Sequence, residues 1–271
     1  GPAFRAMMLG MILIESSTII ALIISVLLFF NGTVITWNSA LADLAAALSV
    51  GVASLVVCVA SSFTVKAAVQ AIGRQPFFAQ KILTLMLIAQ SIIEAIAFFA
   101  FVVAVLIKAR IVDTITLQES IRCCTAGLAI LLGCVGPAIG QAFFTSSVCT
   151  SVGENKDSYG KIFSFTIFGV AFIEAAMIFC LLFALLILFA ALPGEISPML
   201  LVRFAIGAVT MGIGSCATAI ALGRVFSSSA RAIATEPDSY AQLLRPTLIT
   251  AVFIESIIIY ALIVGLLIFK I

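Results

Sequence analysis

The sequence predicts an all-α membrane protein built of tandem transmembrane helical hairpins. Hydrophobic residues make up 63% of the 271 residues and charged residues only 10%, with a mean hydropathy of +1.32. Soluble domains average roughly 45–50% apolar and about 25% charged residues. Two further observations support the prediction, namely a series of long apolar segments and a glutamate that returns about every 80 residues within them.

Composition also excludes several function classes. The chain has no histidine, which removes histidine-based acid–base catalysis and histidine metal sites. A net charge of +2 gives no basic surface for nucleic acid, so we expect no nucleic-acid partner. There is no phosphate-binding loop motif, so we do not expect the chain to hydrolyse ATP or to hold a cofactor. The seven scattered cysteines are interpreted as packing residues.

Seven apolar segments follow one another along the chain. They cover about residues 4–30, 40–70, 78–108, 119–149, 161–191, 199–230 and 241–270. A helix needs about 20 apolar residues to cross the hydrocarbon core, so each segment predicts one transmembrane helix. Membrane strands would instead show short alternating segments. We expect residues 1–32 to form the outer helix of an incomplete first hairpin, and three hairpins to follow at 38–110, 117–192 and 197–271.

Basic residues are unevenly divided between the two sides of the predicted membrane protein. Nine of the 14 are assigned to the side of the polar hairpin loops, with Arg74, Lys156 and Arg224 among them, and five to the other side. The positive-inside rule then places the polar hairpin loops in the cytoplasm. Seven spans leave the N-terminus inside and the C-terminus outside, in a membrane that the sequence does not identify.

One motif occurs in four of the segments, as LIESSTIIALI, IIEAIAFFAFV, FIEAAMIFCLL and FIESIIIYALI. Its glutamates, Glu15, Glu94, Glu174 and Glu255, are 79, 80 and 81 residues apart, which is the length of a helical hairpin repeat. The segments between them are rich in Gly, Ala and Ser, and small residues let membrane helices approach closely. Each repeat therefore pairs a slim helix with a bulkier, lipid-facing helix that carries one carboxyl group.

These glutamates lie deep in apolar runs. Glu94 is 18 residues past Pro76 and 14 before Lys108, which places it roughly 20–27 Å from either end of its helix. An ionised carboxylate near the membrane centre is unfavourable unless it is protonated or paired. We expect no Lys or Arg at matching depth, so each glutamate must bind a proton or a metal cation. A glutamic acid that only bonds to a neighbouring helix would not explain four at a fixed period.

The pattern resembles the c-subunit proteolipids of F-, V- and A-type rotary ATPases over essentially the whole chain. That family has a Gly/Ala-rich inner helix, an Arg-Gln-Pro loop and an outer helix with the essential carboxyl group. Gly73-Arg74-Gln75-Pro76 corresponds to this loop, with Arg74 20 residues before Glu94. The resemblance implies a rotor ring made with copies of the chain or sibling proteolipids, a stator subunit with half-channels, and central stalk subunits that contact Arg74, Gln75 and Pro76.

The resemblance also implies ion ligands. Gly136-Pro137-Ala138-Ile139-Gly140-Gln141 is similar to the inner-helix signature of sodium-translocating members. Their ligands are this Gln, a Glu 33 residues later, and three groups of a neighbouring hairpin: a Ser just after its Glu, a carbonyl two residues before that Glu and a Tyr five residues after it. Gln141 and Glu174 match the first half, and the Phe253 carbonyl, Ser256 and Tyr260 match the second. We therefore expect a Na⁺ site between the third and fourth hairpins.

The other repeats depart from this ligand set. The inner-helix Gln position holds Ser61 in the second repeat and Leu222 in the fourth. Ser16 follows Glu15, whereas Ala95 and Ala175 hold the same position in the second and third repeats. A protonated carboxyl group needs only one acceptor, so these sites are expected to bind protons. The resemblance thus implies a ring that carries Na⁺, H⁺ or both and couples ion flow to rotation.

A repeat-built secondary transporter or channel is the alternative, with the glutamates lining its pathway. Such folds usually contain inverted repeats and broken helices near the membrane centre. The repeats of this chain run in the same order throughout, and only Pro137 interrupts an apolar core. The rotor-ring proteolipid is therefore the favoured function.

Overall fold

A computed structural model describes residues 1–30, 36–189 and 198–269 of the protein. Within these ranges the chain consists of helices joined by short turns, and it contains no strand. The helices in chain order are α1 (Pro2–Phe29), α2 (Trp37–Arg74), η1 (Pro76–Phe78), α3 (Ala79–Arg110), α4 (Leu117–Gly133), α5 (Val135–Glu154), η2 (Lys156–Ser158), α6 (Tyr159–Phe189), α7 (Pro198–Thr235), η3 (Pro237–Ser239) and α8 (Tyr240–Phe269). The predicted boundaries at 32, 192, 197 and 271 lie outside the described residues.

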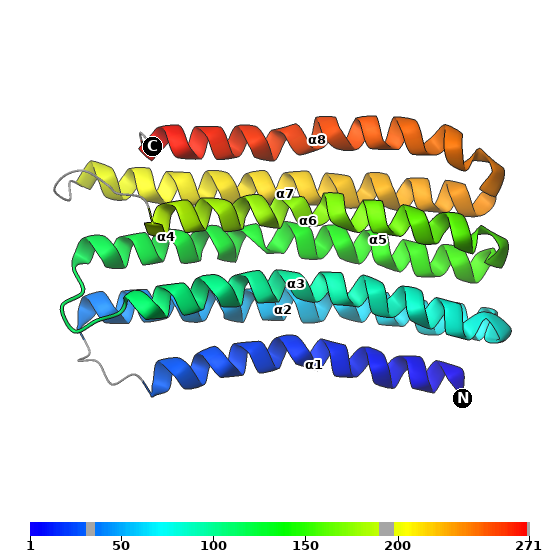
Figure 1. Cartoon of the computed structure of the whole chain (residues 1–271), viewed down its shortest axis with the longest axis horizontal. Coiled ribbons are helices and arrows are strands. Elements are labelled where there is room, and N and C mark those ends of the chain that lie inside the picture. The colour runs from blue at the N-terminus through cyan, green and yellow to red at the C-terminus, as the bar shows by residue number, and fades with distance from the viewer. Residues whose placement is uncertain (31–35, 190–197, 270–271) are drawn as a thin grey trace.

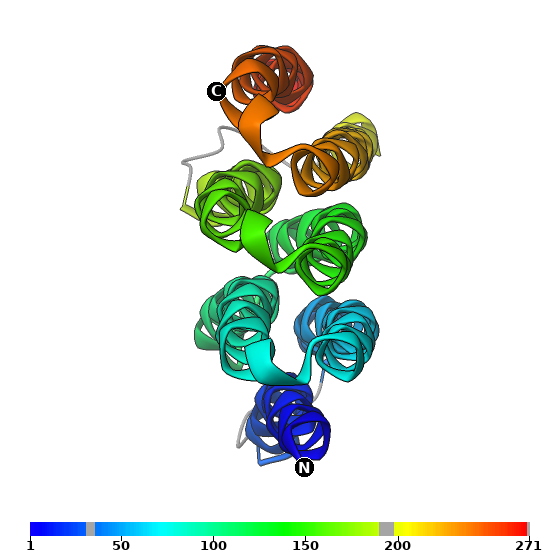
Figure 2. The same cartoon turned by 90° about the vertical axis from the view of Figure 1, so that its right-hand side faces the viewer.

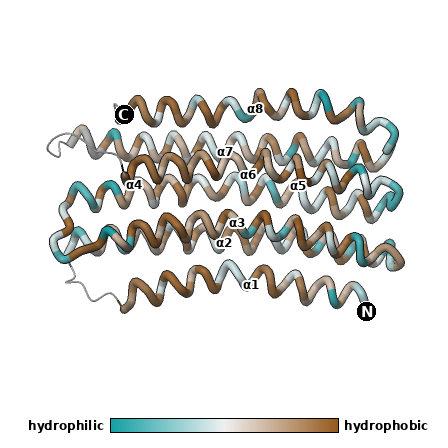
Figure 3. The backbone as a smooth tube through the Cα atoms, in the orientation of Figure 1, coloured by the Kyte–Doolittle hydropathy of each residue, from teal (hydrophilic) through white to brown (hydrophobic). Residues whose placement is uncertain are grey.

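Within the described residues, seven helical stretches, with α4 and α5 taken as one, are long and apolar enough to cross a membrane. This result confirms the predicted all-α membrane protein. Hydrophobic residues fill the middle of the helices, whereas polar residues gather at the hairpin turns and at the start of α4 (Figure 3). Most helices extend a few residues beyond the predicted segments, because polar residues at their ends continue the helix outside the apolar run.

The helices form two layers, which Figures 1 and 2 show from the side and from one end. The slim helices α2, α4 with α5, and α7 lie side by side in one layer, which we call the inner layer. The outer layer contains α3, α6 and α8, and α1 packs against α2 and α3 at one end of the row. The N-terminus and the three hairpin turns lie at the same end of the helices, here named the loop end.

Glycines bring α5 and α7 into close contact in the inner layer. A Cβ atom added at Gly136 would overlap the backbone of Cys216, and one added at Gly140 would overlap the carbonyl group of Ala219. On α2, by contrast, a Cβ atom at Gly51 would meet open space. Small residues thus produce the close approach expected of slim helices, but more tightly at the α5–α7 interface than along this part of α2.

The inner segment of the third repeat is divided into α4 and α5 at Cys134, although the sequence predicts one continuous helix there. Pro137 explains the division, because proline lacks an N–H group and its ring clashes with the carbonyl group four residues earlier. That carbonyl belongs to Gly133, the last residue of α4. The backbone N–H of Ala138 bonds to the Cys134 carbonyl at 3.2 Å, so helical bonding resumes directly after the break.

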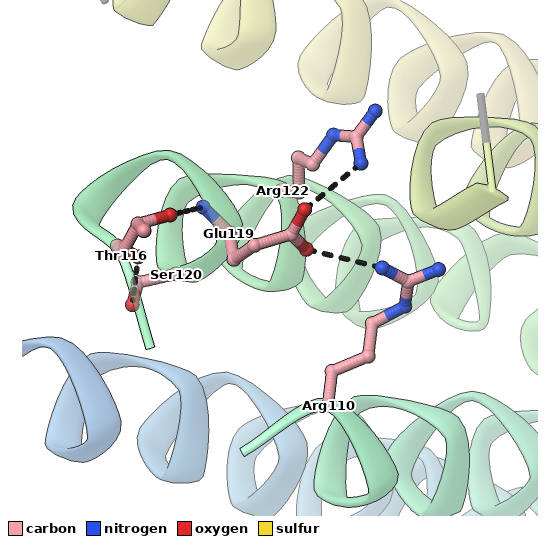
Figure 4. A network of polar contacts seen from close by, with 5 residues as sticks. All are labelled: Arg110, Thr116, Glu119, Ser120 and Arg122. Carbon is pink, nitrogen blue, oxygen red and sulfur yellow. Dashed lines mark hydrogen bonds and ion pairs between the residues drawn. The ribbon is translucent and has the colours of Figure 1, made fainter. Parts of the chain in front are cut away.

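An ion-pair network joins successive hairpins at the end opposite the loop end (Figure 4). At the start of α4, the Glu119 Oε2 lies 3.1 Å from the Arg110 Nη1 of α3, and the Glu119 Oε1 lies 3.1 Å from the Arg122 Nη1. Thr116 caps α4 by accepting a hydrogen bond from the Glu119 backbone at 3.2 Å, and the Ser120 hydroxyl donates to the Asn38 carbonyl of α2 at 2.8 Å. At the loop end, Arg74 and Glu154 make a similar link at 3.3 Å.

Candidate functional site

The repeated glutamates lie on corresponding helices of the four repeats. Glu15 is on α1, Glu94 on α3, Glu174 on α6 and Glu255 on α8, and each stands within an apolar membrane-length helix. Glu15 is exposed, whereas the other three are half-buried. The hairpins run in the same direction along the row (Figure 1), so the regular spacing of 79, 80 and 81 residues predicts similar heights for these carboxyl groups.

Glu94 contacts two hydroxyl groups from two other helices. Its Oε2 lies 2.8 Å from the Ser16 Oγ of α1, and its Oε1 lies 3.5 Å from the Ser61 Oγ of α2. The Ser16 Oγ also lies 2.7 Å from the Leu13 carbonyl oxygen. The structure therefore brings together Ser16, Ser61 and Glu94, which the sequence analysis named as candidate ion-binding residues.

The number of hydrogen atoms available for donation limits which ion this cluster can bind. A serine hydroxyl has one hydrogen to donate, yet the Ser16 Oγ is within hydrogen-bonding distance of both the Leu13 carbonyl and the Glu94 carboxyl group. Both contacts are satisfied if Glu94 carries a proton and donates it to Ser16, while Ser16 donates to Leu13. A small cation bound by the Ser16 and Glu94 oxygen atoms would also satisfy their contact, with the Ser16 hydroxyl still donating to Leu13. The geometry is thus suited to a proton or a hard cation.

Further polar contacts fix α1 beside this cluster. The buried Gln90, one turn before Glu94, donates its Nε2 hydrogen to the Gly10 carbonyl at 3.2 Å. The Ser54 hydroxyl of α2 donates to the Ser17 carbonyl at 2.8 Å. Gln90 was not predicted from the sequence, although a glutamine four residues before Glu94 in an apolar helix lies on the same face as Glu94, which is a signal for a shared site.

The environment of Gln141 and Glu174 is different. Gln141 is fully buried on α5, and neither atom of its side-chain amide has a hydrogen-bond partner within the described part of the chain. No hydrogen bond between Gln141 and Glu174 occurs among the described residues. A buried amide without a partner is unfavourable by about 1–3 kcal/mol. Gln141 is therefore a candidate ligand whose polar atoms the rest of the described chain does not satisfy.

The second half of the predicted sodium set lies on α8. Phe253 and Tyr260 are 72% and 63% exposed, and the Ser256 hydroxyl donates to the Phe253 carbonyl at 2.7 Å. This local bond repeats the one between Ser16 and Leu13. No hydrogen bond joins these α8 groups to Gln141 or Glu174 among the described residues, so the five-ligand set stays a prediction.

The contact at Glu94 has a definite direction along the row. Glu94 takes its hydroxyl partner from the preceding repeat, whereas the predicted sodium set takes it from the following one. Applied to Glu174, the observed direction offers Ala95, which has no hydroxyl group. Applied to Glu255, it offers Ala175. A hydroxyl contact like that between Glu94 and Ser16 is therefore not available to Glu174 or Glu255 from the preceding repeat.

Arg224 corrects the expectation that no basic residue lies at the depth of the glutamates. It is two residues past Leu222, the position that corresponds to Ser61, and eleven residues before the end of α7. Its guanidinium carbon lies 5.8 Å from the centre of the Phe143 ring. The sequence places Arg224 on the loop side and within the apolar segment 199–230, and α7 continues as a helix past it to Thr235.

The Arg-Gln-Pro loop is the turn between α2 and α3. Arg74 is the last residue of α2, Gln75 bonds through its backbone N–H to the Ala71 carbonyl at 2.9 Å, and Pro76 starts η1. The next residue, Phe77, is fully exposed. Asp157 and Asp238 hold the corresponding positions in the other two hairpin turns. The three loops are therefore chemically different.

Among the described residues no group of three or more His, Cys, Asp and Glu side chains could hold a metal ion. Among the repeated glutamates, the structure shows hydroxyl partners from other helices for Glu94. Parallel helical hairpins that are long and apolar enough to span a membrane, with one carboxyl group per repeat, are the architecture of a membrane proteolipid.

Comparison with known proteins gives the family. The sequence profile of the ATP synthase c-subunit matches three times in tandem, at residues 44–107, 124–187 and 205–268, and these matches cover more than half of the chain. The chain belongs to the ATP synthase c-subunit family, as a fused form with several hairpins. Membership makes it a rotor proteolipid of a rotary ATPase and an integral membrane protein.

Curated relatives each correspond to about one hairpin. The ATP synthase c-subunit of Dehalococcoides mccartyi is 37% identical over 73 residues, which is 27% of this chain and 96% of the relative. The c-subunit of Chloroflexus aurantiacus is 32% identical over 75 residues, or 28% of this chain and 99% of the relative. That of Geotalea uraniireducens is 38% identical over 65 residues, covering 24% and 71% of the two chains.

Proposed function

We propose that this chain builds an ion-carrying rotor ring, with further copies of itself or sibling proteolipids, in a rotary ATP synthase or ATPase. The observation that carries the proposal is the Glu94 cluster, in which a membrane carboxyl group meets the hydroxyl groups of Ser16 and Ser61 from two other helices. A site assembled between repeats in this way allows the carboxyl group to bind an ion at one position of the rotating ring and to release it at another.

Burial of the outer helices supports association with a further copy. Four positions of α1 that face the next hairpin are buried, and so are the corresponding positions of α3 and α6. On α8 the corresponding positions are exposed. The four sets are Ala6, Gly10, Ser17 and Ile24; Leu85, Ala89, Ile96 and Val103; Phe165, Gly169, Ala176 and Phe183; and Pro246, Thr250, Ile257 and Val264. The exposed face of α8 is thus the one with which each earlier repeat contacts its successor.

The ion differs between sites in this proposal. Glu94 carries a proton, which satisfies both contacts of Ser16. Following the direction of the Glu94 contact, the Phe253 carbonyl, Ser256 and Tyr260 face Glu15 of the next copy and offer it oxygen ligands suited to Na⁺. The alternative assignment joins these same groups to Gln141 and Glu174, as the resemblance to sodium-translocating members implies.

Transport then follows from charge neutralisation. A carboxyl group that has bound H⁺ or Na⁺ is neutral and can face hydrocarbon at far lower free energy than the ionised group. We propose that half-channels in a stator subunit exchange the ion on the two sides, and that the Arg74–Pro76 turn contacts central stalk subunits on the cytoplasmic side. The parallel order of the hairpins does not favour the alternative of an inverted-repeat transporter.

Carbodiimide labelling of the purified assembly, read peptide by peptide with and without Na⁺, tests the proposal. Carbodiimide reacts with protonated carboxyl groups in apolar surroundings, so Glu94 should be labelled whether Na⁺ is present or not. Protection of Glu15 by Na⁺ would support the assignment across copies, and protection of Glu174 would support the alternative one. An assembly in which none of the four glutamates is labelled would contradict the role as ion carriers.

A further inference from the structure

Each helix of the inner layer carries one polar side chain at one of two positions that are a helical turn apart. The pairs of positions are Val57 and Ser61 on α2, Pro137 and Gln141 on α5, and Thr218 and Leu222 on α7. On α2 and α5 the polar group is at the second position, from which Ser61 contacts Glu94 at 3.5 Å. On α7 the second position holds Leu222, but the first holds Thr218. The polar group of the fourth repeat is therefore present, displaced by one turn.

The hydroxyl group of Thr218 has no partner of its own. The residue is fully buried, and its oxygen atom makes no hydrogen bond within the described part of the chain. Buried threonines in helices commonly donate to the carbonyl group four residues earlier, as Thr145 and Thr166 do at 2.7 Å each. Thr218 makes no such bond to the Gly214 carbonyl. Because a buried hydroxyl without a partner is unfavourable, an acceptor on another helix would stabilise it.

The neighbours of Thr218 along α7 show which helices it lies between. A Cβ atom added at Gly214, four residues earlier, would lie 2.6 Å from the Ala261 Cβ of α8. The Ser215 hydroxyl, three residues earlier, lies 3.4 Å from the Ala176 carbonyl oxygen of α6. Residues three and four apart share a helix face, so Thr218 lies where α6, α7 and α8 meet.

Glu255 is at the same level on the facing side of α8. The two helices run in opposite directions, and the Cβ atom added at Gly214 would also lie 3.4 Å from the Ile258 Cδ1. Thr218 is one turn, about 6 Å, closer to the loop end than Gly214. One turn in the same direction from Ala261 and Ile258 leads to residues 254–257, which include Glu255. Ile258 shares a face with Glu255 and is fully buried, so Glu255 and Thr218 lie at the same junction of helices.

We propose that Thr218 is the hydroxyl partner of Glu255. Its hydroxyl hydrogen, which no group of the described chain accepts, is donated to the Glu255 carboxyl group when that side chain turns towards α7. The positions that supply hydroxyl groups to Glu94 hold Leu222 and Ala175 in this repeat, so Thr218 provides a bond that these two residues cannot make. Thr218 is thus a positioning residue that holds Glu255 against α7. Its effect on transport rests on the proposed role of Glu255 as an ion carrier.

Infrared spectroscopy of the full-length assembly tests this contact. The carbonyl stretching band of the protonated Glu255 side chain is identified as the band that is lost in Glu255→Gln. A hydrogen bond lowers the stretching frequency of a carbonyl group, so Thr218→Val, which keeps the shape and removes the hydroxyl, should move this band to higher frequency. Thr218→Ser keeps a hydroxyl group and should leave the band in place. Thr166→Val is the matched control, because that buried hydroxyl bonds to the Ile162 carbonyl at 2.7 Å.

Ion-coupled transport in reconstituted vesicles separates the contact from its function. Loss of the bond in Thr218→Val should lower coupled transport at a limiting ion gradient about fivefold, whereas Thr166→Val should not. A Glu255 band that is unchanged in Thr218→Val would overturn the proposal. A shifted band with normal transport would support the contact and contradict the use of Glu255 as an ion carrier, so the two failures are distinguishable. If Thr218→Val prevents assembly, Thr218→Ala removes the same hydroxyl group and is judged by the same band.

Discussion

Glu94 and Glu174 occupy corresponding positions of successive repeats, yet their surroundings differ. Glu94 meets the hydroxyl groups of Ser16 and Ser61 at 2.8 and 3.5 Å. Glu174 has a buried glutamine on its inner helix, Gln141, whose amide makes no hydrogen bond within the described residues. The repeated fold therefore sets the height of the carboxyl group, while one or two neighbouring side chains set the polar groups around it. Under the proposed function, this difference gives two ion sites of different chemistry in one chain.

Removal of the better-partnered carboxyl group should have the largest effect. Glu94→Gln abolishes the group that binds the ion while it keeps the size of the side chain, so nearly all ion-coupled ATP synthesis or pumping in reconstituted vesicles should be lost. Glu154→Gln is the control, because its exposed ion pair with Arg74 contributes at most about 1 kcal/mol to stability. Normal coupling in the Glu94 variant would show that this site is not used.

Removal of the hydroxyl group that distinguishes the two sites should have the next largest effect. Ser16→Ala removes the hydrogen bond to the Glu94 carboxyl group. That bond contributes about 1 kcal/mol, which corresponds to roughly a fivefold change in ion affinity. Coupled transport at a limiting ion gradient should fall by a similar factor. Thr18→Ala is the matched control, because the Thr18 hydroxyl bonds to the Glu15 carbonyl of its own helix at 2.7 Å. Equal losses in both variants would contradict a specific role for Ser16.

Addition of the missing hydroxyl group should give Glu174 a hydroxyl oxygen like that of Ser16, together with the Gln141 amide oxygen that the Glu94 site lacks, and so favour Na⁺ at Glu174. By the repeat, Ala95→Ser supplies a hydroxyl oxygen from the preceding repeat to the Glu174 site, and it should strengthen Na⁺ protection of Glu174 against carbodiimide roughly fivefold. Ala175→Ser adds the same group beside Glu255, whose inner helix offers Leu222 and no amide. It should therefore produce no protection by Na⁺. Protection in both variants, or in neither, would remove Gln141 from the ligand set.

The smallest effect is expected on stability, from the two buried glutamines. Gln141→Leu removes an amide without partners, so the melting temperature should stay unchanged or rise, although any Na⁺ protection of Glu174 that depends on the amide should disappear. Gln90→Leu removes the bond to the Gly10 carbonyl at 3.2 Å and should destabilise the protein, by about 1 kcal/mol. Thermal unfolding in detergent compares the two. A larger loss for Gln141→Leu would mean that its amide has partners in the assembly.

Local features of the sequence were sufficient for much of the fold. Apolar segment length identified the membrane helices, and the repeat of Glu15, Glu94, Glu174 and Glu255 identified the carboxyl groups, because both depend on residues close together in the chain. The break at Cys134 was less predictable, since proline within a membrane helix can be accommodated in several ways. The depth of Arg224 was less apparent, because it becomes clear only when Leu222, two residues earlier, is matched to Ser61, which contacts Glu94.

A membrane protein of long helices with one carboxyl group per repeat follows from the sequence alone, because lipid solvation and helical periodicity act on local sequence. The repeat that supplies the hydroxyl partner of Glu94 became known from the packing of the helices. Ser16 and Glu94 are 78 residues apart, and their contact depends on the side of α2 on which α1 packs. Packing between helices likewise left one face of α8 exposed and placed Arg224 over Phe143. These arrangements arise from contacts between distant segments, which no local pattern encodes.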